Sequence, residues 1–183
     1  NNTLKIAEKK TNVMFDKCII ATGSKPISLP FINIDKKRVI TSTEALSLNE
    51  IPKHLVIIGG GVIGLELGQV YKRLGSEVSV IEYSDKITPF MDSDISKELL
   101  KILKKQKINF YLSHEVFEVE NKKNIISIKA KNKNDEIKTF ECDYCLVSVG
   151  RKAYTEGLGL ENVGIEIDSS YPFRIPKKII IND

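Results

Sequence analysis

The strongest constraint on the fold is an apolar stretch that breaks into glycines and then resumes as a predicted helix. Leu55–Ile58 is apolar without polar alternation, which is typical of a strand buried on both faces. Glycines then follow at the G-x-G-x-x-G spacing, where they allow a tight turn, close approach of a pyrophosphate and close packing of helix on strand. We predict a phosphate-binding turn at a helix N-terminus. Its residues are Gly59, Gly60, Gly61, Val62, Ile63 and Gly64.

The surrounding sequence completes a βαβ unit. Apolar residues recur at helical spacing from Ile63 to Leu74, Gly75 offers a helix stop, and residues 77–82 indicate a second strand. Glu82 ends this strand, where a carboxylate can accept both ribose hydroxyls of an adenosine. A 2′-phosphate would place like charges together there, and Tyr83-Ser84-Asp85 supplies no arginine. NAD is therefore favoured over NADP.

Composition excludes several other classes of protein. The chain has 183 residues, is 42% hydrophobic and 28% charged, and has no apolar run long enough to span a bilayer. Its net charge of +4 comes from scattered lysines, which indicates a solvated surface and no nucleic-acid partner. Nothing at the start resembles a targeting peptide, so we expect that the targeting segment is absent or was cut away, and we expect no membrane partner.

The remaining elements extend an α/β fold. We predict strands at 3–7 and 13–21, the latter including Cys18–Ala21, then a connector at 26–52 that links two bodies and holds one short helix, Ser42–Leu46. After Glu82 we predict a helix capped by Asp92 that buries Ile95, Leu99, Ile102 and Leu103, a strand at 108–112, an antiparallel meander at 115–141 and a buried strand at 144–149. The fold class is thus a Rossmann-like parallel sheet with helices plus a β-meander.

The three cysteines do not form a disulfide framework. Cys142 and Cys145 match C-x-x-C, but they enter a buried strand rather than open a helix. Residues three apart on one strand point to opposite faces, so we expect the two sulfurs to diverge and to have no redox role. Zinc would need a second pair, and only Cys18 remains, so no metal site is predicted.

Several ordered motifs together resemble the pyridine-nucleotide disulfide oxidoreductases, over nearly the whole chain. They are Ile19–Ser24, Thr41–Leu48, Gly59–Gly68 with Arg73–Gly75 and Glu82, Leu146–Arg151, and Leu158–Glu161 with Gly164-Ile165. The resemblance is to the members that oxidise dihydrolipoamide, and in particular to mitochondrial ones. It implies a flavoprotein with two dinucleotide-binding domains, of which this chain is a truncated part. Residues 1–50 would be FAD-domain strands and connector, 51–150 the NAD-binding domain, and 151–183 a return to the FAD domain.

The resemblance also implies roles by position. The glycine turn would hold the NAD pyrophosphate, Glu82 the adenosine ribose, and Glu66 would approach the nicotinamide. Val116 and Gly150 would contact the adenine and nicotinamide sides through backbone. Three residues would touch FAD: Thr22, Gly23 and Ser24.

The resemblance implies that the chain carries only the NAD half of the chemistry. The family's Cys-x4-Cys disulfide and its C-terminal His-Glu pair are absent here, so no catalytic residue is assigned. The complete enzyme would oxidise dihydrolipoamide on lipoylated subunits of 2-oxoacid dehydrogenase complexes, form a homodimer and work in the mitochondrial matrix. Two alternatives stay open: another flavin disulfide reductase or NADH oxidase, and a non-catalytic NAD-binding or scaffold protein.

Overall fold

The computed structural model describes residues 3–6, 11–123 and 125–165. The chain divides into two compact units, and each is described by itself. One unit comprises residues 26–152, and the other comprises residues 1–25 and 153–183.

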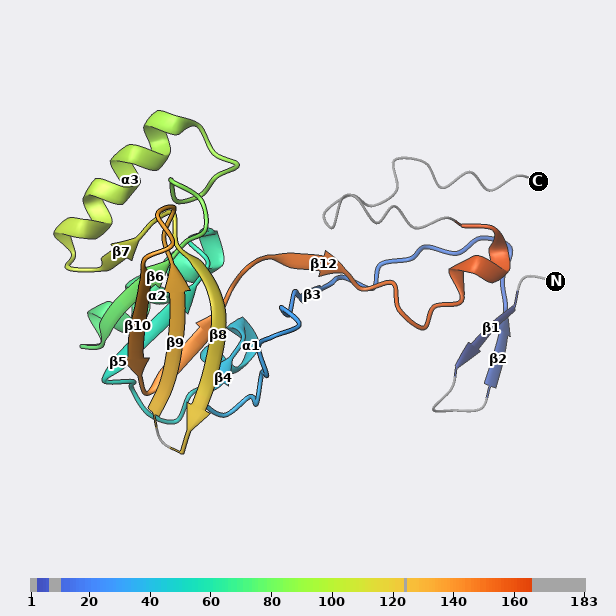
Figure 1. Ribbon diagram of the computed structural model, residues 1–183. Helices are drawn as coiled ribbons and strands as arrows, with labels where there is room; N and C mark the ends of the chain where they lie inside the picture. The colour runs from blue at the N-terminus through green and yellow to red at the C-terminus, as the bar shows by residue number, and fades with distance from the viewer. Residues whose placement is uncertain (1–2, 7–10, 124, 166–183) are drawn as a thin grey trace. The chain divides into compact units, whose positions relative to one another are not determined.

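The larger unit is built on a five-stranded parallel sheet in the order β4-β11-β5-β6-β7 (Figure 1). The strands are β4 (Val39–Ile40), β5 (His54–Ile58), β6 (Glu77–Ile81), β7 (Asn109–Tyr111) and β11 (Tyr144–Val147). The chain passes from β5 through β6 to β7 on one side, and it then returns so that β11 pairs on the other side of β5. The strand order therefore reverses between β5 and β11, and ligands of open α/β sheets bind beyond the carboxyl ends of strands at such a point.

Helix α2 (Val62–Arg73) connects β5 to β6 as predicted. It ends in a Schellman motif: Gly75, at a φ of +108°, donates to Lys72 O at 3.2 Å, and Ser76 donates to Tyr71 O at 3.0 Å. Glycine at this position accepts the left-handed conformation without a steric penalty. The stop at Gly75 is confirmed, and the chain turns directly into β6.

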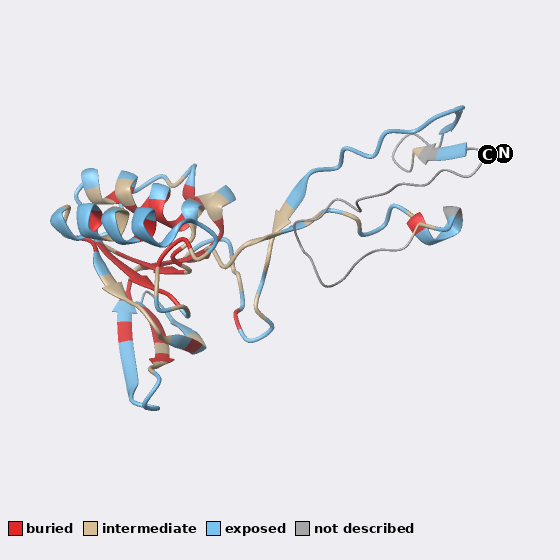
Figure 2. Ribbon diagram, turned by 90° about the horizontal axis from the view of Figure 1, so that it is seen from above, coloured by how far each residue is buried: buried red, intermediate tan, exposed pale blue. Residues whose placement is uncertain are grey.

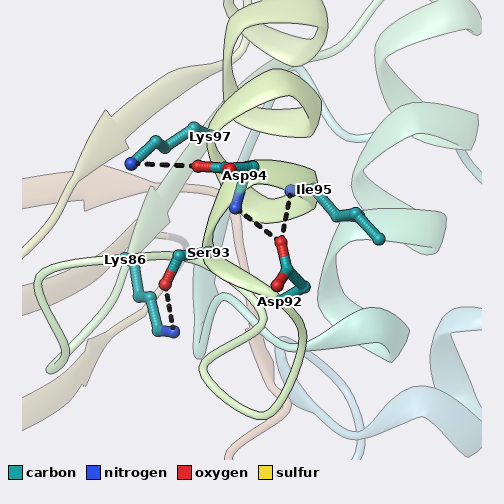
Figure 3. Close-up of polar contacts among 6 residues, drawn as sticks. All are labelled: Lys86, Asp92, Ser93, Asp94, Ile95 and Lys97. Atoms are coloured by element: carbon teal, nitrogen blue, oxygen red, sulfur yellow. Dashed lines mark hydrogen bonds and ion pairs between the residues drawn. The ribbon is translucent and has the colours of Figure 1, made fainter.

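Helix α3 (Ser93–Lys105) connects β6 to β7, and Asp92 caps it as predicted. The Asp92 carboxylate accepts hydrogen bonds from the backbone nitrogens of Asp94 at 2.8 Å and Ile95 at 3.4 Å (Figure 3). Asp94 in the first turn also pairs with Lys97 on the next turn, at 3.2 Å. Negative charge at the N-terminus of the helix and lysines at its C-terminus both interact favourably with the helix dipole.

The predicted buried face of α3 is partly wrong. Ile95 and Ile102 are 60% and 44% exposed, whereas Ser96 is 1% exposed and Leu103 is fully buried. The face toward the sheet runs through Ser96, Leu99 and Leu103, with Leu100 also packed there. Ser96, a polar residue, therefore occupies a core position. A prediction from the apolar residues alone chooses the wrong face of the helix, because it does not count Ser96.

The predicted meander forms a separate antiparallel sheet in the order β10-β9-β8. Its strands are β8 (Glu115–Lys122), β9 (Ile125–Lys131) and β10 (Ile137–Cys142).

The parallel sheet has a core on each face. In β5, Leu55 and Ile57 pack in the hydrophobic core that includes residues of the helices, whereas Val56 and Ile58 pack in the core that includes residues of the meander. Figure 2 shows these buried strands, in red, beneath the exposed outer faces of the helices.

The connector is more than a link between two bodies, which corrects the prediction. β4 pairs with β11, and the short helix α1 (Ser42–Ala45) packs on the same core. α1 begins with a capping box in which Thr41 accepts from Thr43 N and Glu44 accepts from Thr41 N. The buried Tyr71 hydroxyl of α2 donates to Ala45 O and ties α1 to α2.

The smaller unit contains a hairpin, β1 (Thr3–Ile6) with β2 (Thr11–Met14), and the 3₁₀ helix η1 (Leu160–Val163). β3 (Ser24–Pro26) pairs with β12 (Arg151–Ala153), and the division between the units falls within these two strands. The predicted strand at Cys18–Ala21 is not formed, and Ile19 is 91% exposed. An apolar run forms a strand only beside a pairing partner, and none of the described strands pairs with this one. The sequence beyond Ile165 lies outside the described residues.

No helix in the described part of the chain has the length and apolar character needed to cross a membrane.

Candidate dinucleotide-binding site

Gly59 makes the turn out of β5 against the chain that leaves β11. Its φ is +107°, and a Cβ there would lie 2.6 Å from the carbonyl oxygen of Ser148. Ser148 also donates from its backbone nitrogen to Ile58 O at 2.9 Å and from its hydroxyl to Gly59 O at 3.2 Å. Glycine at position 59 is therefore required both by its conformation and by the close approach of another backbone.

Glu82 is hydrogen-bonded to the glycine turn. Gly60 N donates to its Oε2 at 2.6 Å, and Ser84 N donates to its Oε1 at 2.7 Å. The residue is 8% exposed, and its side chain is held in one orientation from both sides. Each carboxylate oxygen has a further lone pair, so the group can still accept hydrogen bonds from ribose hydroxyls.

Gly61 and the start of α2 offer backbone donors. A Cβ at Gly61 would meet no heavy atom within 4 Å, so the space beside it is open. No side chain caps α2, and its first turn has no acidic residue. Helix N–H groups in this state, at the positive end of the helix dipole, are suited to an anion such as a pyrophosphate. The residues of this turn thus fit a dinucleotide.

Gly64 lets α2 pack closely on the sheet, as predicted. A Cβ there would lie 2.5 Å from Ser148 Oγ, 2.6 Å from Gly59 O and 3.0 Å from Ile57 Cγ2. The third glycine of the motif therefore has a packing role, in contrast to the open position at Gly61.

Three other predicted residues lie in the same unit in different settings. Glu66 is exposed, one turn into α2. Val116 is 8% exposed and belongs to the meander core, beside a β-bulge between Val116 and Glu118. Gly150 has a φ of +123°, and its carbonyl accepts from Ile27 N at 3.0 Å. Only backbone of Val116 and Gly150 could contact a nucleotide, because one side chain is buried and the other is absent.

The predicted flavin contacts belong to the smaller unit, and the glycine turn belongs to the larger one. Thr22 donates from Oγ1 to Tyr154 O at 2.6 Å, and Gly23, at a φ of +73°, accepts from Tyr154 N at 2.9 Å. Ser24 begins β3. All three are exposed.

Sequence reasoning missed three polar residues that hold the turn: Ser148, Thr88 and Ser96. Thr88 N donates to Gly60 O at 2.9 Å, and the Thr88 and Ser96 hydroxyl oxygens are 2.9 Å apart. Thr88 and Ser96 are 4% and 1% exposed. For Ser96 the only signal in the sequence is a small polar residue at a helical core spacing, which is common on solvated faces too.

The two C-x-x-C cysteines are free, and our geometric reason for dismissing them is wrong. They lie on different strands, Cys142 at the end of β10 and Cys145 in β11, and both side chains join the meander core. Burial raises the pKa of Cys142 to about 12 and the pKa of Cys145 well above its usual value. Both thiols are therefore protonated at neutral pH and poorly reactive. In the residues that the structure describes, no three His, Cys, Asp or Glu side chains gather as metal ligands.

A parallel sheet with a switch point, a glycine turn and an acid at the next strand end define a Rossmann-type dinucleotide-binding domain. Comparison with known families agrees with this class. Residues 1–175 match the family model described as pyridine nucleotide-disulphide oxidoreductase, and the chain belongs to this family. Enzymes of the family use FAD and NAD.

Two curated relatives and one solved structure show the range of similar proteins. A dihydrolipoamide dehydrogenase of Chaetomium thermophilum is 48% identical over 87% of this chain and 32% of its own length. A mitochondrial dihydrolipoyl dehydrogenase of Schizosaccharomyces pombe is 42% identical over 90% of this chain and 34% of its own. The HOCl-induced flavoprotein disulfide reductase of Escherichia coli has a TM-score of 0.80 at 28% identity, over 92% of this chain and 38% of its own. The chain thus spans about a third of these relatives' length.

Proposed function

We propose that this chain is the NAD-binding portion of a dihydrolipoamide dehydrogenase. The observation that carries the proposal is the 2.6 Å hydrogen bond from Gly60 N to Glu82 Oε2, because it joins the turn that we assign to the pyrophosphate to the acid that we assign to the ribose, beside the switch point of the sheet. The identities of 42–48% to proteins of that name support the choice within the family. In the complete protein, NAD would accept the electrons that FAD and a redox disulfide take from dihydrolipoamide.

The chain's own residues bind and orient the nucleotide. The backbone of Gly59–Gly64 holds the pyrophosphate, and Val62 and Ile63 contribute N–H donors from the first turn of α2. Glu82 accepts the ribose hydroxyls and repels a 2′-phosphate. Glu66 approaches the nicotinamide, and backbone at Val116 and Gly150 flanks the two ends of the nucleotide.

The smaller unit belongs to the flavin side of the protein. Thr22, Gly23 and Ser24 touch FAD in this proposal, and a Cβ at Gly23 would meet no heavy atom within 4 Å, so the space beside it is open. The chain has no Cys-x4-Cys sequence, so the disulfide that meets dihydrolipoamide is supplied from elsewhere in the complete protein.

The proposal is tested with the complete protein, by following NADH formation from NAD⁺ and dihydrolipoamide. We expect turnover with free dihydrolipoamide and with a lipoylated protein domain. A protein that binds flavin and NADH but leaves dihydrolipoamide unoxidised would contradict it. The second candidate is another flavin disulfide reductase, and the TM-score of 0.80 to the Escherichia coli reductase supports it. This candidate predicts that the protein oxidises NADH with a different disulfide or oxidant.

Partners and location follow from the same proposal. The complete protein forms a homodimer, binds lipoylated subunits of 2-oxoacid dehydrogenase complexes and works in the mitochondrial matrix. A mitochondrial relative supports this location, whereas the Escherichia coli protein is bacterial. Sedimentation of the complete protein and co-purification with lipoylated subunits from a mitochondrial fraction test these statements, and a monomer in the cytosolic fraction would contradict them.

A further inference from the structure

Thr88 has an unusual backbone. Its φ is +45°, and among the described non-glycine residues it is the only buried and the only β-branched one with a positive φ. β-Branched side chains are strained in this region, and such strain persists only where the surroundings enforce it. Thr88 follows Ile87, which is fully buried in the core, so the segment is anchored immediately before the strained residue.

Two side-chain hydrogen bonds to α3 hold Thr88 in this conformation. The Ser96 hydroxyl donates to Thr88 O at 3.3 Å, so the Thr88 hydroxyl is the donor in the 2.9 Å contact between the two side-chain oxygens. Met91 N also donates to Thr88 O, at 2.8 Å. Both hydroxyls are buried, and water does not compete for them.

The strained conformation aims the Thr88 N–H at the glycine turn. Thr88 N donates to Gly60 O at 2.9 Å, while Gly60 N donates to Glu82 Oε2 at 2.6 Å. Both backbone groups of Gly60 are therefore engaged, one by Thr88 and one by Glu82. A continuous set of hydrogen bonds runs from α3 through Ser96, Thr88 and Gly60 to Glu82.

We propose that Thr88 is a positioning residue for the dinucleotide site, holding Gly60 and through it Glu82 in the orientation that binds the nucleotide. This inference rests on the proposed function. Thr88 touches the turn, not the nucleotide, and it acts by preorganisation. A turn that is already ordered loses less conformational entropy on binding, so loosening it weakens nucleotide binding without altering the groups that contact the nucleotide.

The experiment compares NADH dissociation constants of variants of the complete protein by isothermal titration calorimetry, with its flavin and disulfide fully reduced beforehand so that NADH cannot pass electrons to them. Thr88→Val keeps the shape of the side chain and the backbone strain but removes the hydroxyl that bonds to Ser96. The strained backbone at position 88 then relaxes, and we expect NADH to bind about fivefold more weakly. Thr88→Ser restores the hydroxyl and binds like the unaltered protein. Thr88→Gly binds NADH more tightly than Thr88→Val, because glycine adopts the positive φ without strain. Ser96→Ala weakens binding like Thr88→Val, and the double variant is no weaker than either, because both break one network.

A matched control separates positioning from loss of stability. The Ser76 hydroxyl, 1% exposed, donates to Pro52 O at 2.6 Å just before β6, at the amino ends of the strands, whereas the glycine turn lies at the carboxyl end of β5. Ser76→Ala lowers the Tm as Thr88→Val does but leaves the NADH dissociation constant unchanged. Turnover of dihydrolipoamide with saturating NAD⁺ also stays unchanged in Thr88→Val, while KM for NAD⁺ rises. Equal NADH affinity in Thr88→Val and the unaltered protein, or weaker binding in Thr88→Gly than in Thr88→Val, would overturn the inference. Failure of the unaltered protein to bind NADH would instead reject the proposed function.

Discussion

The backbone nitrogen of Gly60 lies 2.6 Å from Oε2 of Glu82, so the acid that follows β6 is hydrogen-bonded to the turn that follows β5. This contact gives Glu82 two duties, because the same carboxylate fixes the turn and faces the nucleotide's ribose in our proposal. It also explains how a carboxylate can be buried to 8% exposure: backbone N–H groups of Gly60 and Ser84 compensate for its burial.

Glu82→Gln tests both duties. The amide has one neutral acceptor oxygen in place of two charged ones, so either the Gly60 or the Ser84 N–H loses its acceptor and the other keeps only a neutral one. We expect the free energy of unfolding to fall by about 1–3 kcal/mol and NADH to bind about tenfold more weakly. Urea unfolding and calorimetry measure the two effects, with Glu141→Gln on the exposed surface of β10 as the control. Unchanged stability would show that the Gly60 contact is unimportant.

Gly61→Ala and Gly64→Ala separate binding from packing. At Gly64 a Cβ would meet Ser148 Oγ at 2.5 Å and Gly59 O at 2.6 Å, so we expect alanine to destabilise the fold by about 1–3 kcal/mol. At Gly61 a Cβ meets nothing within 4 Å, and alanine should cost no more than about 1 kcal/mol as a poorer N-cap. Its methyl group enters the space that we assign to the pyrophosphate, so Gly61→Ala should lose NADH binding while its Tm falls by no more than about 4 °C. Normal NADH binding by Gly61→Ala would place the phosphates elsewhere.

Tyr71→Phe tests whether the connector is part of the core. The buried Tyr71 hydroxyl donates to Ala45 O, and its removal leaves that carbonyl without this donor. We expect the free energy of unfolding to fall by about 1–3 kcal/mol. Tyr83→Phe, at a residue 74% exposed, is the control and should change it by less than about 0.5 kcal/mol. Equal effects of the two substitutions would mean that α1 contributes little to stability.

The cysteines give a prediction on pH. Burial raises the pKa of Cys142 to about 12 from the usual 9.0, and the pKa of Cys145 also rises, so the folded state holds both protons more tightly than the unfolded chain. Their contribution to stability is complete below about pH 9 and is lost as pH rises toward 12. At pH 8 a thiol-alkylating reagent should label exposed Cys18 and spare the other two, as peptide mass spectrometry would show. Rapid native labelling of Cys142 or Cys145, or a disulfide between them, would contradict this account.

Much of the larger unit could be predicted because its patterns are local. Leu55–Ile58 shows the burial of β5 on both faces, the three glycines mark the turn, and Asp92 marks the start of α3. The strand order could not be read in this way. The position of β11 between β4 and β5 depends on pairings between distant segments, and β4 has two residues, too few to give a periodic pattern.

The missed residues have a common physical cause. Ser96 and Thr88 satisfy each other's hydroxyls, so burial costs them little, but the sequence does not show that pairing. Cys18–Ala21 has strand composition, yet pairing depends on a neighbouring strand as much as on propensity. Cys142 and Cys145 pack in the same core because the chain bends at Asp143, between β10 and β11. A prediction from the sequence that places both cysteines on one strand misses this bend.

Nucleotide preference of the complete protein tests the central claim most directly. The quantity to measure is the ratio of the NADPH and NADH dissociation constants, by calorimetry at fixed salt on the fully reduced protein, which accepts no electrons from either nucleotide. Because the Glu82 carboxylate is held beside the turn with no arginine following it in the sequence, we predict that NADH binds at least about tenfold more tightly than NADPH. Equal affinities, or a preference for NADPH, would contradict the assignment of Glu82 as the ribose ligand and with it the proposed site.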